Sequence, residues 1–500
     1  MHASRWSLER SALALGMAAL AAGPVWVGLR AIGVSAGVAV VVSGGLLAAL
    51  AIGMSRRLPR ALDGCARRRP RAALLVALLW LGGAASVLRI APFMADPEST
   101  WGAPIPDNDF YLHHDCATAY VRAAELARAG VANLYETEQY TGTVDGDPRQ
   151  QIGRFAVDPY EYPPPFLLPV RAAIALTDDF TVIRAGWFTL EAALFAAAVI
   201  GLAIWLRGRD GVALGLLAPA VLASVPVLGT LAVGNFQLAA YALAVLAMLA
   251  VERDRDALAG ALLAFAIVAK LFPGLLLVLL VARSRWRAVG WTAAFAALYA
   301  GLALAVLGTD PFRAFISYQL PRMADGSAFP FLAGFPPATA VNHAVFGLIF
   351  KLRLVGVPAM TTGVAGALAW IYTGAVVAFA YVRGRKRRGS RLGEAMLWLV
   401  LLQLGALRSP FTPDLYALVL PVWMLVLLAV RAAGPARAAI AAAWLAIGAA
   451  VLFLPVTAAA NGAIPMGAYL LLTGAAQLLG FAVVTAAISL DEAAEHGSAR

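Results

Sequence analysis

The sequence has few charged residues and very few cysteines for its length. Of its 500 residues, 13% are charged and 61% are hydrophobic, and the mean hydropathy is +0.79. These values exclude an ordinary soluble globular protein, in which about a quarter of the residues are charged. The two cysteines, Cys65 and Cys116, are predicted to lie on opposite sides of a membrane. They exclude a disulfide framework and a cysteine metal site.

Long hydrophobic runs account for this composition. Runs rich in Ala, Leu, Val and Gly recur along the chain, and many are long enough to cross a hydrocarbon core of roughly 30 Å. They lack the alternation of a membrane β-barrel strand. We therefore predict an all-α polytopic membrane protein. The first run, 12–29, is too long for a signal peptide and lacks a convincing cleavage site, so we interpret it as an anchor.

Positive charge is concentrated in short loops. The net charge of +11 therefore indicates topology and not nucleic-acid binding, because cytoplasmic loops are enriched in Lys and Arg. Basic clusters near Arg5–Arg10, over 56–71 and over 383–391 place the N-terminus in the cytoplasm. The loop after the third span is then predicted to lie outside, at a bacterial inner (plasma) membrane.

We predict about fourteen transmembrane helices with both termini cytoplasmic. The run 257–282 has charged residues at both ends, so we predict a hairpin of two short or re-entrant helices that breaks at Pro273-Gly274. From the third onward, the predicted spans are 72–92, 184–206, 211–231, 236–251, 257–269, 272–282, 288–307, 357–382, 393–407, 412–431, 437–456 and 466–489.

Half of the 28 acidic residues lie between Asp96 and Asp179, a segment that we name the acidic loop. A carboxylate held within reach of a hydroxyl can remove its proton, so Asp109 and Asp115 are candidate catalytic bases. The alternative is that one or both are helix N-caps, since Asp115 begins an amphipathic segment that ends at Gly130. The neighbouring His113 and His114 have no established metal-ligand spacing, so we expect them to bind substrate or to pack, and we predict no metal.

Two cations interrupt apolar segments. Lys270, at the tip of the predicted hairpin, is expected to bind a phosphate; the alternative is that it snorkels to the interface. Arg408 either clamps a phosphate through two hydrogen bonds or pairs with Asp414 as a structural bridge. The pair Asn342-His343 and the turn Gly234–Gln237 offer further polar groups that are expected to lie on the outer side.

The order of these motifs resembles glycosyltransferase family 87, a membrane family of the GT-C superfamily that includes polyprenyl-phosphate-mannose-dependent mannosyltransferases. The resemblance covers roughly residues 95 to 430. It depends on Asp109-Phe110, Tyr162-Pro163-Pro164-Pro165-Phe166, Gly234-Asn235-Phe236-Gln237, Ala269-Lys270-Leu271-Phe272-Pro273, Val341-Asn342-His343 and Ser409-Pro410 with Tyr416.

The resemblance implies a glycosyltransferase (hexosyltransferase) with a GT-C-like bundle. A polyprenyl-phosphate-sugar donor, a glycolipid or glycan acceptor and inversion on the outer face are expected, with membrane lipids as surroundings and no cofactor. The loop aspartate, Asp109 or Asp115, would be the base, and His343 would assist the acceptor or the phosphate. The expected substrate-binding residues are Lys270, Arg408, His113, His114, Tyr162, Asn235, Gln237, Asn342, Asp414 and Tyr416.

The predicted spans, together with the resemblance, divide the chain. We expect two N-terminal helices with a basic loop over 1–71, a catalytic membrane core over 72–432 with outer loops 93–183 and 308–356, further helices over 433–490 and a disordered cytoplasmic tail over 491–500. The competing interpretation is a transporter or flippase of a lipid-linked envelope precursor. Polar breaks near one surface and the lack of an internal repeat favour the enzyme.

Overall fold

The computed structural model describes residues 8–57, 65–144, 147–386 and 388–497. As predicted, the chain is an all-α polytopic protein, and its described strands are two short antiparallel pairs within the acidic loop. Of the basic residues used above to predict topology, Arg5, Arg60 and Arg387 lie outside the described residues.

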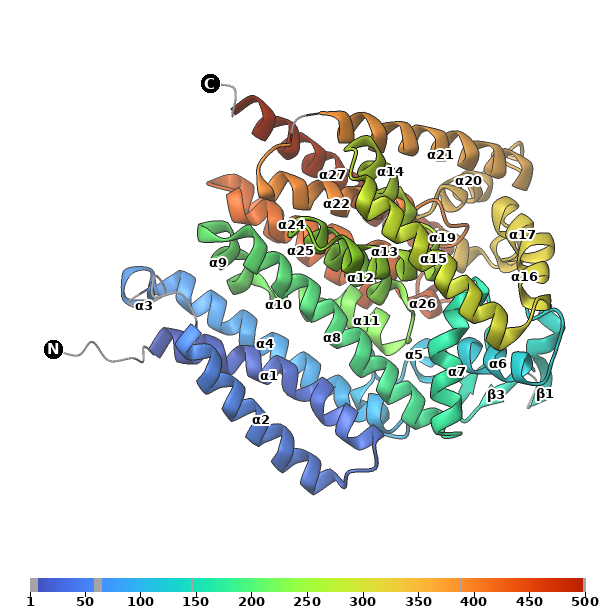
Figure 1. The fold of residues 1–500 in the computed structure, drawn as a ribbon, viewed down its shortest axis with the longest axis horizontal. Coiled ribbons are helices and arrows are strands. Elements are labelled where there is room, and N and C mark those ends of the chain that lie inside the picture. Colours follow the sequence, from blue (N-terminus) through green and yellow to red (C-terminus); the bar gives the residue numbers. More distant parts are fainter. Residues whose placement is uncertain (1–7, 58–64, 145–146, 387, 498–500) are drawn as a thin grey trace.

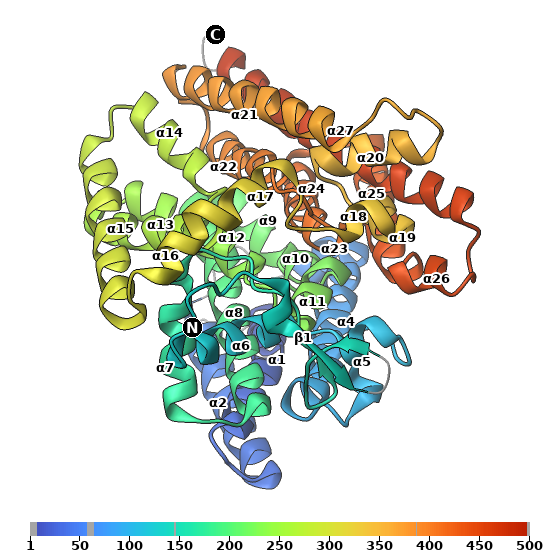
Figure 2. The ribbon, with the colours of Figure 1, turned by 90° about the vertical axis from the view of Figure 1, so that its right-hand side faces the viewer.

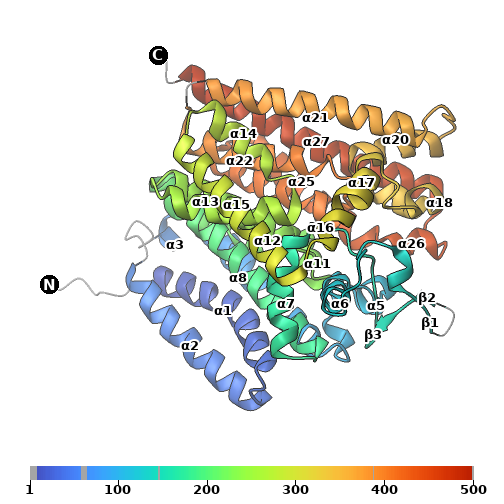
Figure 3. The ribbon, with the colours of Figure 1, turned by 45° about the vertical axis from the view of Figure 1, so that its right-hand side comes forward.

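The N-terminal helices form one flank of the molecule (Figures 1 and 3). There α1 packs between α2 and α4 and also contacts α8 (Phe180–Leu206), whereas α2 packs mainly on α1. The bounds are α1 (Leu8–Ala31), α2 (Ala36–Arg57), α3 (Cys65–Arg68) and α4 (Pro70–Ala95).

The acidic loop is folded throughout its described part. Aromatic side chains make its core, and Tyr120, Tyr135, Tyr160 and Phe166 are fully buried. Its elements are η2 (Thr100–Gly102), α5 (Asp109–His113), α6 (Ala117–Arg128), η3 (Thr137–Tyr140), β1 (Thr141–Val144), β2 (Asp147–Arg149), β3 (Gln151–Ile152), β4 (Phe155–Ala156), η4 (Pro164–Phe166) and α7 (Leu167–Leu176).

The central helices follow. α12 is buried along nearly its whole length, and α8 and α13 pack against it. The carboxylate of Asp179 caps α8 by accepting the N–H groups of Thr181 and Val182. The bounds are α9 (Gly208–Leu217), α10 (Pro219–Leu222), α11 (Val225–Ala232), α12 (Gln237–Val251), α13 (Asp256–Lys270), α14 (Gly274–Ala282) and α15 (Trp286–Leu307).

A second loop segment, 308–361, consists of short helices and leads into the C-terminal helices. The segment contains α16 (Asp310–Ala314), η5 (Phe315–Gln319), α17 (Leu320–Asp325), α18 (Phe331–Gly334), α19 (Pro336–Val341) and α20 (Val345–Leu354). The C-terminal helices are α21 (Thr362–Arg385), α22 (Arg391–Ala406), α23 (Asp414–Ala417), α24 (Val419–Arg431), α25 (Pro435–Phe453), α26 (Val456–Ala460) and α27 (Met466–Gly497). Since α27 continues to Gly497, the expected disordered tail is helical over its described part.

The expected count of about fourteen spans is not confirmed. In the described residues, nine helices are long and apolar enough to cross a membrane, or ten if α11 and α12, bent by 115°, count as one broken span. The expected span 211–231 is divided into α9, α10 and α11, with Pro219 and Pro226 in the first turns of α10 and α11. Helices α13, α14 and α22 are shorter than a full crossing.

The two ends of the bundle differ in composition (Figure 1). One end holds the start of α1, the end of α27, α3 and the arginine-rich end of α21. We name it the basic end. The other, the loop end, carries the acidic loop and segment 308–361. Figure 2 looks onto the loop end, where α16–α18 cross above α5 and α6, and α26 lies to one side. This separation matches the predicted segregation of basic and acidic loops.

The predicted hairpin is confirmed. α13 ends at Lys270, Leu271 has a φ of +26°, and α14 begins at Gly274. The start of α13 and the end of α14 lie close together. Arg285 pairs with Asp254 at 3.3 Å, and Arg287 pairs with Asp256 at 3.4 Å. The pair of helices therefore enters from the basic end, turns at Lys270 and returns.

A buried ion pair fixes the returning helix. Arg283 forms two hydrogen bonds to Glu394 of α22, of 2.6 and 2.9 Å, and the two side chains are only 6% and 7% exposed. We expect Arg283→Met to lower the free energy of unfolding by about 3–5 kcal/mol, because it leaves a buried carboxylate without its partner. Thermal unfolding of the purified protein in detergent measures this effect.

The matched control is Arg287→Met, whose side chain is 86% exposed. An exposed ion pair contributes only about 0–1 kcal/mol, so this variant should unfold close to the wild-type temperature. Equal unfolding temperatures for Arg283→Met and Arg287→Met would contradict the structural role of the Arg283–Glu394 pair.

Candidate active site

A large cavity lies at the loop end, with a volume of about 1370 Å³. Its walls come from the acidic loop, the tip of the α13–α14 hairpin, segment 308–361, the turn between α22 and α23, and α26. The volume exceeds the roughly 300–1,000 Å³ of a common small-molecule pocket, so there is room for a sugar donor together with an acceptor.

Most of the residues predicted from the sequence line this one cavity. They come from segments far apart in the chain, and the fold brings them together: Asp109, His113, His114, Tyr162, Asn235, Gln237, Lys270, Arg408, Asp414 and Tyr416. Asp115, Asn342 and His343 do not line it.

Asp109 faces the cavity from the first turn of α5. Its side chain is exposed, and among the described residues no hydrogen bond or ion pair engages its carboxylate. The neighbouring Asn108 donates a 2.8 Å hydrogen bond to the hydroxyl of Thr457, which joins α5 to α26. The carboxylate is therefore held at the cavity by its helix but remains available to a ligand.

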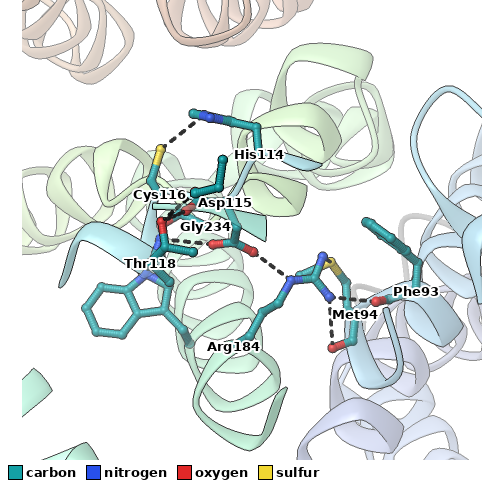
Figure 4. A network of polar contacts seen from close by, with 11 residues as sticks. Phe93, Met94, His114, Asp115, Cys116, Thr118, Arg184 and Gly234 are labelled. Carbon is teal, nitrogen blue, oxygen red and sulfur yellow. Dashed lines mark hydrogen bonds and ion pairs between the residues drawn. The ribbon is translucent and has the colours of Figure 1, made fainter. Parts of the chain in front are cut away.

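Asp115 has a different position. Its carboxylate is fully buried and accepts a 2.6 Å hydrogen bond from Nε of Arg184, and it also accepts the N–H of Ala117 at the start of α6 at 2.9 Å. Figure 4 shows it pointing to Arg184, which also donates to the carbonyl of Phe93 at 2.6 Å. The geometry corrects the expectation that Asp115 is a candidate base and supports the alternative of a structural group at a helix start.

The turn Gly234–Gln237 packs on this ion pair. Gly234 has a φ of +60°, and a Cβ there would lie 2.7 Å from Oδ1 of Asp115. A glycine is therefore required at this position. The carbonyl of Gly234 accepts a 3.1 Å hydrogen bond from Trp187 (Figure 4), so Asn235 is directed from a fixed turn toward the cavity.

Lys270 extends from the hairpin tip into the cavity. Its ammonium donates a 3.0 Å hydrogen bond to Oδ1 of Asn235 and lies 4.6 Å from the centre of the Tyr162 ring. No carboxylate in the described part of the chain is within ion-pair distance of it. Its charge is oriented by neutral groups and is available to an anion.

Arg408 is also free of a carboxylate partner among the described residues. The predicted bridge to Asp414 is not formed; instead, Nε donates to the hydroxyl of Thr373 at 2.7 Å, and the guanidinium lies 5.1 Å from the centre of the Trp370 ring. The remaining N–H groups can bind an anion in the cavity. Lys270 and Arg408 therefore give one wall an excess of positive charge.

The two histidines have different partners. Nδ1 of His113 is 3.0 Å from the carbonyl of Arg154, and Nδ1 of His114 is 3.2 Å from the carboxylate of Asp158. Burial alone would lower the pKa of His114, but Asp158 and Cys116 raise it to about 9. His114 is thus held by a charge partner that sequence reasoning did not identify.

The structure also disagrees with the expectation that Asn342 and His343 contact the substrate, because neither residue lines the cavity. The side chain of Asn342 is buried, accepts the N–H groups of Ala344 and Thr412, each at 3.0 Å, and donates to the carbonyl of Pro410 at 2.8 Å. It fixes the turn that carries Arg408. His343 is only 3% exposed and lies outside the cavity lining, so its position does not support a catalytic role.

Sequence reasoning also missed several cavity residues: Cys116, Tyr120, Asp158 and Glu161. Glu161 accepts a hydrogen bond from Gln319 of the π-helical turn η5, and burial raises its pKa well above the usual value. The sequence signal that could have identified Asp158 and Glu161 is their position, because they lie four residues and one residue before Tyr162 and the three prolines.

The arrangement suits a reaction in which a group is transferred from a donor to an acceptor and the part of the donor that leaves is an anion. An available carboxylate on the loop side can accept a proton, and two cations on the membrane side can stabilise a developing negative charge. Apolar side chains such as Leu271, Leu275 and Val376 complete the wall near these cations.

The chain was compared with known protein families, curated proteins and solved structures. A model of glycosyltransferase family 87 matches residues 160–410. No curated protein and no solved structure matches the chain. The matched region includes Tyr162, Asn235, Lys270 and Arg408, and it begins after Asp109.

The buried pair Asp115–Arg184 generates a prediction about stability. We expect Arg184→Met to lower the free energy of unfolding by about 3–5 kcal/mol, because the fully buried Asp115 carboxylate is then left without its countercharge. The double variant Asp115→Asn/Arg184→Met should recover part of this loss, since it removes both charges. Thermal unfolding in detergent measures both effects.

The control is Asp109→Asn, which changes an exposed carboxylate six positions earlier and should leave the unfolding temperature unchanged. A double variant less stable than Arg184→Met would argue against uncompensated charge as the cause.

Proposed function

Because the chain belongs to glycosyltransferase family 87, we propose that this membrane glycosyltransferase moves a hexose such as mannose from a polyprenyl-phosphate donor to a lipid or glycan acceptor. We place the reaction on the outer face of a bacterial plasma membrane, with both termini in the cytoplasm. The positive-inside rule supports this orientation, since α3 and the end of α21 are rich in arginine.

One observation carries the proposal. Asp109, Lys270 and Arg408 line the same cavity, although they lie on three separate segments of the chain. None of the three is neutralised by an ion pair in the described residues. A carboxylate and two uncompensated cations that line one cavity are what an inverting transfer from a lipid phosphate requires.

The donor phosphate binds at Lys270 and Arg408. The bond from the anomeric carbon to the phosphate oxygen breaks in the reaction, and its electron pair leaves with the polyprenyl phosphate. Cations placed at this oxygen stabilise the charge that develops there. The ring of Tyr162 and the amide of Asn235 orient the ammonium of Lys270 for this purpose.

The polyprenyl chain has an apolar route beside this phosphate site. Ile316, Leu320, Trp370 and Val377 line the cavity and are also exposed on the surface of the protein, at 64%, 39%, 61% and 39%. Exposed apolar side chains of a membrane protein face lipid. The tail can therefore remain in lipid between η5–α17 and α21 while the phosphate reaches the cations.

Asp109 is the proposed general base. The acceptor hydroxyl attacks the anomeric carbon from the face opposite the phosphate, which inverts the configuration, and its proton passes to the Asp109 carboxylate. Polar groups at Gln237, His113, His114, Asp414 and Tyr416 also line the cavity and are proposed to bind sugar and acceptor hydroxyls.

The base assignment is tested by sugar transfer in proteoliposomes. Purified protein would be supplied with labelled polyprenyl-phosphate sugars and lipid acceptors. We expect Asp109→Asn to lower the transfer rate by about 10²–10⁴-fold, the usual contribution of a general base. Asp107→Asn is the matched control, because Asp107 is also exposed but does not line the cavity.

Wild-type rates in Asp109→Asn would remove Asp109 from the mechanism. Movement of the lipid across the bilayer without any transfer of its sugar would sink the enzyme proposal and favour a transporter.

The cation assignment has its own test. We expect Lys270→Met and Arg408→Met each to lower kcat/KM for the donor at least about tenfold, as expected for loss of a hydrogen bond to a charged group. Initial rates measured against donor concentration give this value. Arg313→Met is the control, since that side chain is 79% exposed on the same loop end and lies outside the cavity. An unchanged kcat/KM for the donor in both cavity variants would refute their phosphate role.

A further inference from the structure

A second group of reactive side chains lies in the wall of the cavity. His114, Cys116 and Asp158 each offer one ligand atom, and these atoms lie within 4.8 Å of one another. The carboxylate of Asp158 is 3.2 Å from Nδ1 of His114, and Sγ of Cys116 is 3.6 Å from Nε2 of the same ring. Figure 4 shows His114 and Cys116 turned toward each other and away from the Asp115–Arg184 pair.

From this convergence we propose that His114, Cys116 and Asp158 form a binding site for a divalent metal ion of the zinc type. Imidazole nitrogen, thiolate sulfur and carboxylate oxygen are the ligand atoms that Zn²⁺ takes in proteins. The mixture of a soft sulfur with nitrogen and oxygen disfavours Mg²⁺ and Ca²⁺, which prefer oxygen ligands alone. The three residues are different from the proposed base and phosphate ligands, although Asn235 contacts both Cys116 and Lys270.

The backbone around the three ligands is already in place. The N–H of Cys116 donates to the carbonyl of Val233 at 2.8 Å, and His114 forms a β-bridge with Ala156, two residues before Asp158. Nδ1 of His114 faces Asp158 and Nε2 faces Cys116, so only one of the two nitrogens can bind the ion. The ring must therefore turn for that nitrogen, the sulfur and a carboxylate oxygen to reach metal–ligand distances of about 2.0–2.3 Å. The side chains of His114 and Asp158, 21% and 23% exposed, have room to turn for this.

Neighbouring groups can support a bound ion. Asn235 donates from Nδ2 to Sγ of Cys116 at 3.3 Å, and the Tyr416 hydroxyl lies 3.5 Å from the same sulfur. The ring of Phe110 stacks on His114 with centroids 4.5 Å apart. Such outer contacts orient metal ligands and stabilise a thiolate. The ion displaces the thiol proton of Cys116 and the proton shared by His114 and Asp158, which pass to solvent.

The site would have an open coordination position. Three protein ligands leave a fourth position for water or substrate, and all three residues line the cavity. The ion would add a third cation to the cavity, and only the amide of Asn235 would separate it from Lys270, because Asn235 contacts both Lys270 and Cys116. The two cysteines alone cannot form a cysteine metal site, but the fold brings His114 and the distant Asp158 to Cys116.

The test uses the full-length protein in detergent, with any polyhistidine tag removed. After chelation, the protein is titrated with Co²⁺, which substitutes for Zn²⁺ and gives a thiolate-to-metal absorption band. We expect one metal ion per chain, measured by elemental analysis, and the thiolate band. Cys116→Ser should abolish the band, whereas Cys65→Ser, which changes the other cysteine of the chain, should retain it.

Two further ligand variants test the proposal independently, in case Cys116→Ser fails to fold. His114→Ala and Asp158→Asn should each weaken Co²⁺ affinity at least about tenfold, whereas His113→Ala, at the adjacent histidine, should not. A wild-type protein without the band, a band that persists in Cys116→Ser, or affinities unchanged in both ligand variants would overturn the proposal. Because no arm measures sugar transfer, failure here is distinct from failure of the proposed function.

Discussion

The buried ion pair between Asp115 and Arg184 organises the loop end of this protein. Arg184 lies in the first turns of α8 and also donates to the carbonyl of Phe93 near the end of α4. One guanidinium thus joins the helix before the acidic loop, Asp115 within the loop and the helix that follows it. The cavity residues Asp109, His114 and Cys116 all lie within six positions of the anchored Asp115.

The membrane side of the cavity follows from a second constraint. Backbone polar groups must be satisfied within lipid, so non-helical segments occur only where protein or a cavity covers them. The break after Lys270 and the turn between α22 and α23 meet this condition, because both line the cavity. Cations that would be costly in lipid are located at these breaks. Their partners are neutral groups: Asn235 and Tyr162 for Lys270, and Thr373 and Trp370 for Arg408.

The two walls therefore have different chemical characters. The membrane wall combines uncompensated cations with apolar side chains, as suits a lipid phosphate. The loop wall carries Asp109, Asp158 and Glu161 together with His114 and Cys116. The proposed base and the proposed metal site can both lie on this wall, because Asp109 is at the start of α5 and His114 is just after its end. Family membership agrees with this division but specifies neither the donor nor the acceptor.

The sequence by itself determined what depends on local composition. Apolar length identified the membrane helices, Pro273 and Gly274 identified the hairpin break, and the arginine clusters predicted which loops lie together. The predicted count of about fourteen spans is not confirmed in the described residues, where Pro219 and Pro226 divide one apolar run into short helices. Only the tertiary structure shows that Asp109 lines the cavity whereas Asp115 is buried against Arg184, and that Arg408 does not pair with Asp414. It also shows that Asn342 and His343 lie outside the cavity lining and that Asp158 lies beside His114 and Cys116. The physical reason is that a side chain's role depends on its burial and on partners such as Arg184, which come from segments far away in the chain and leave no local pattern.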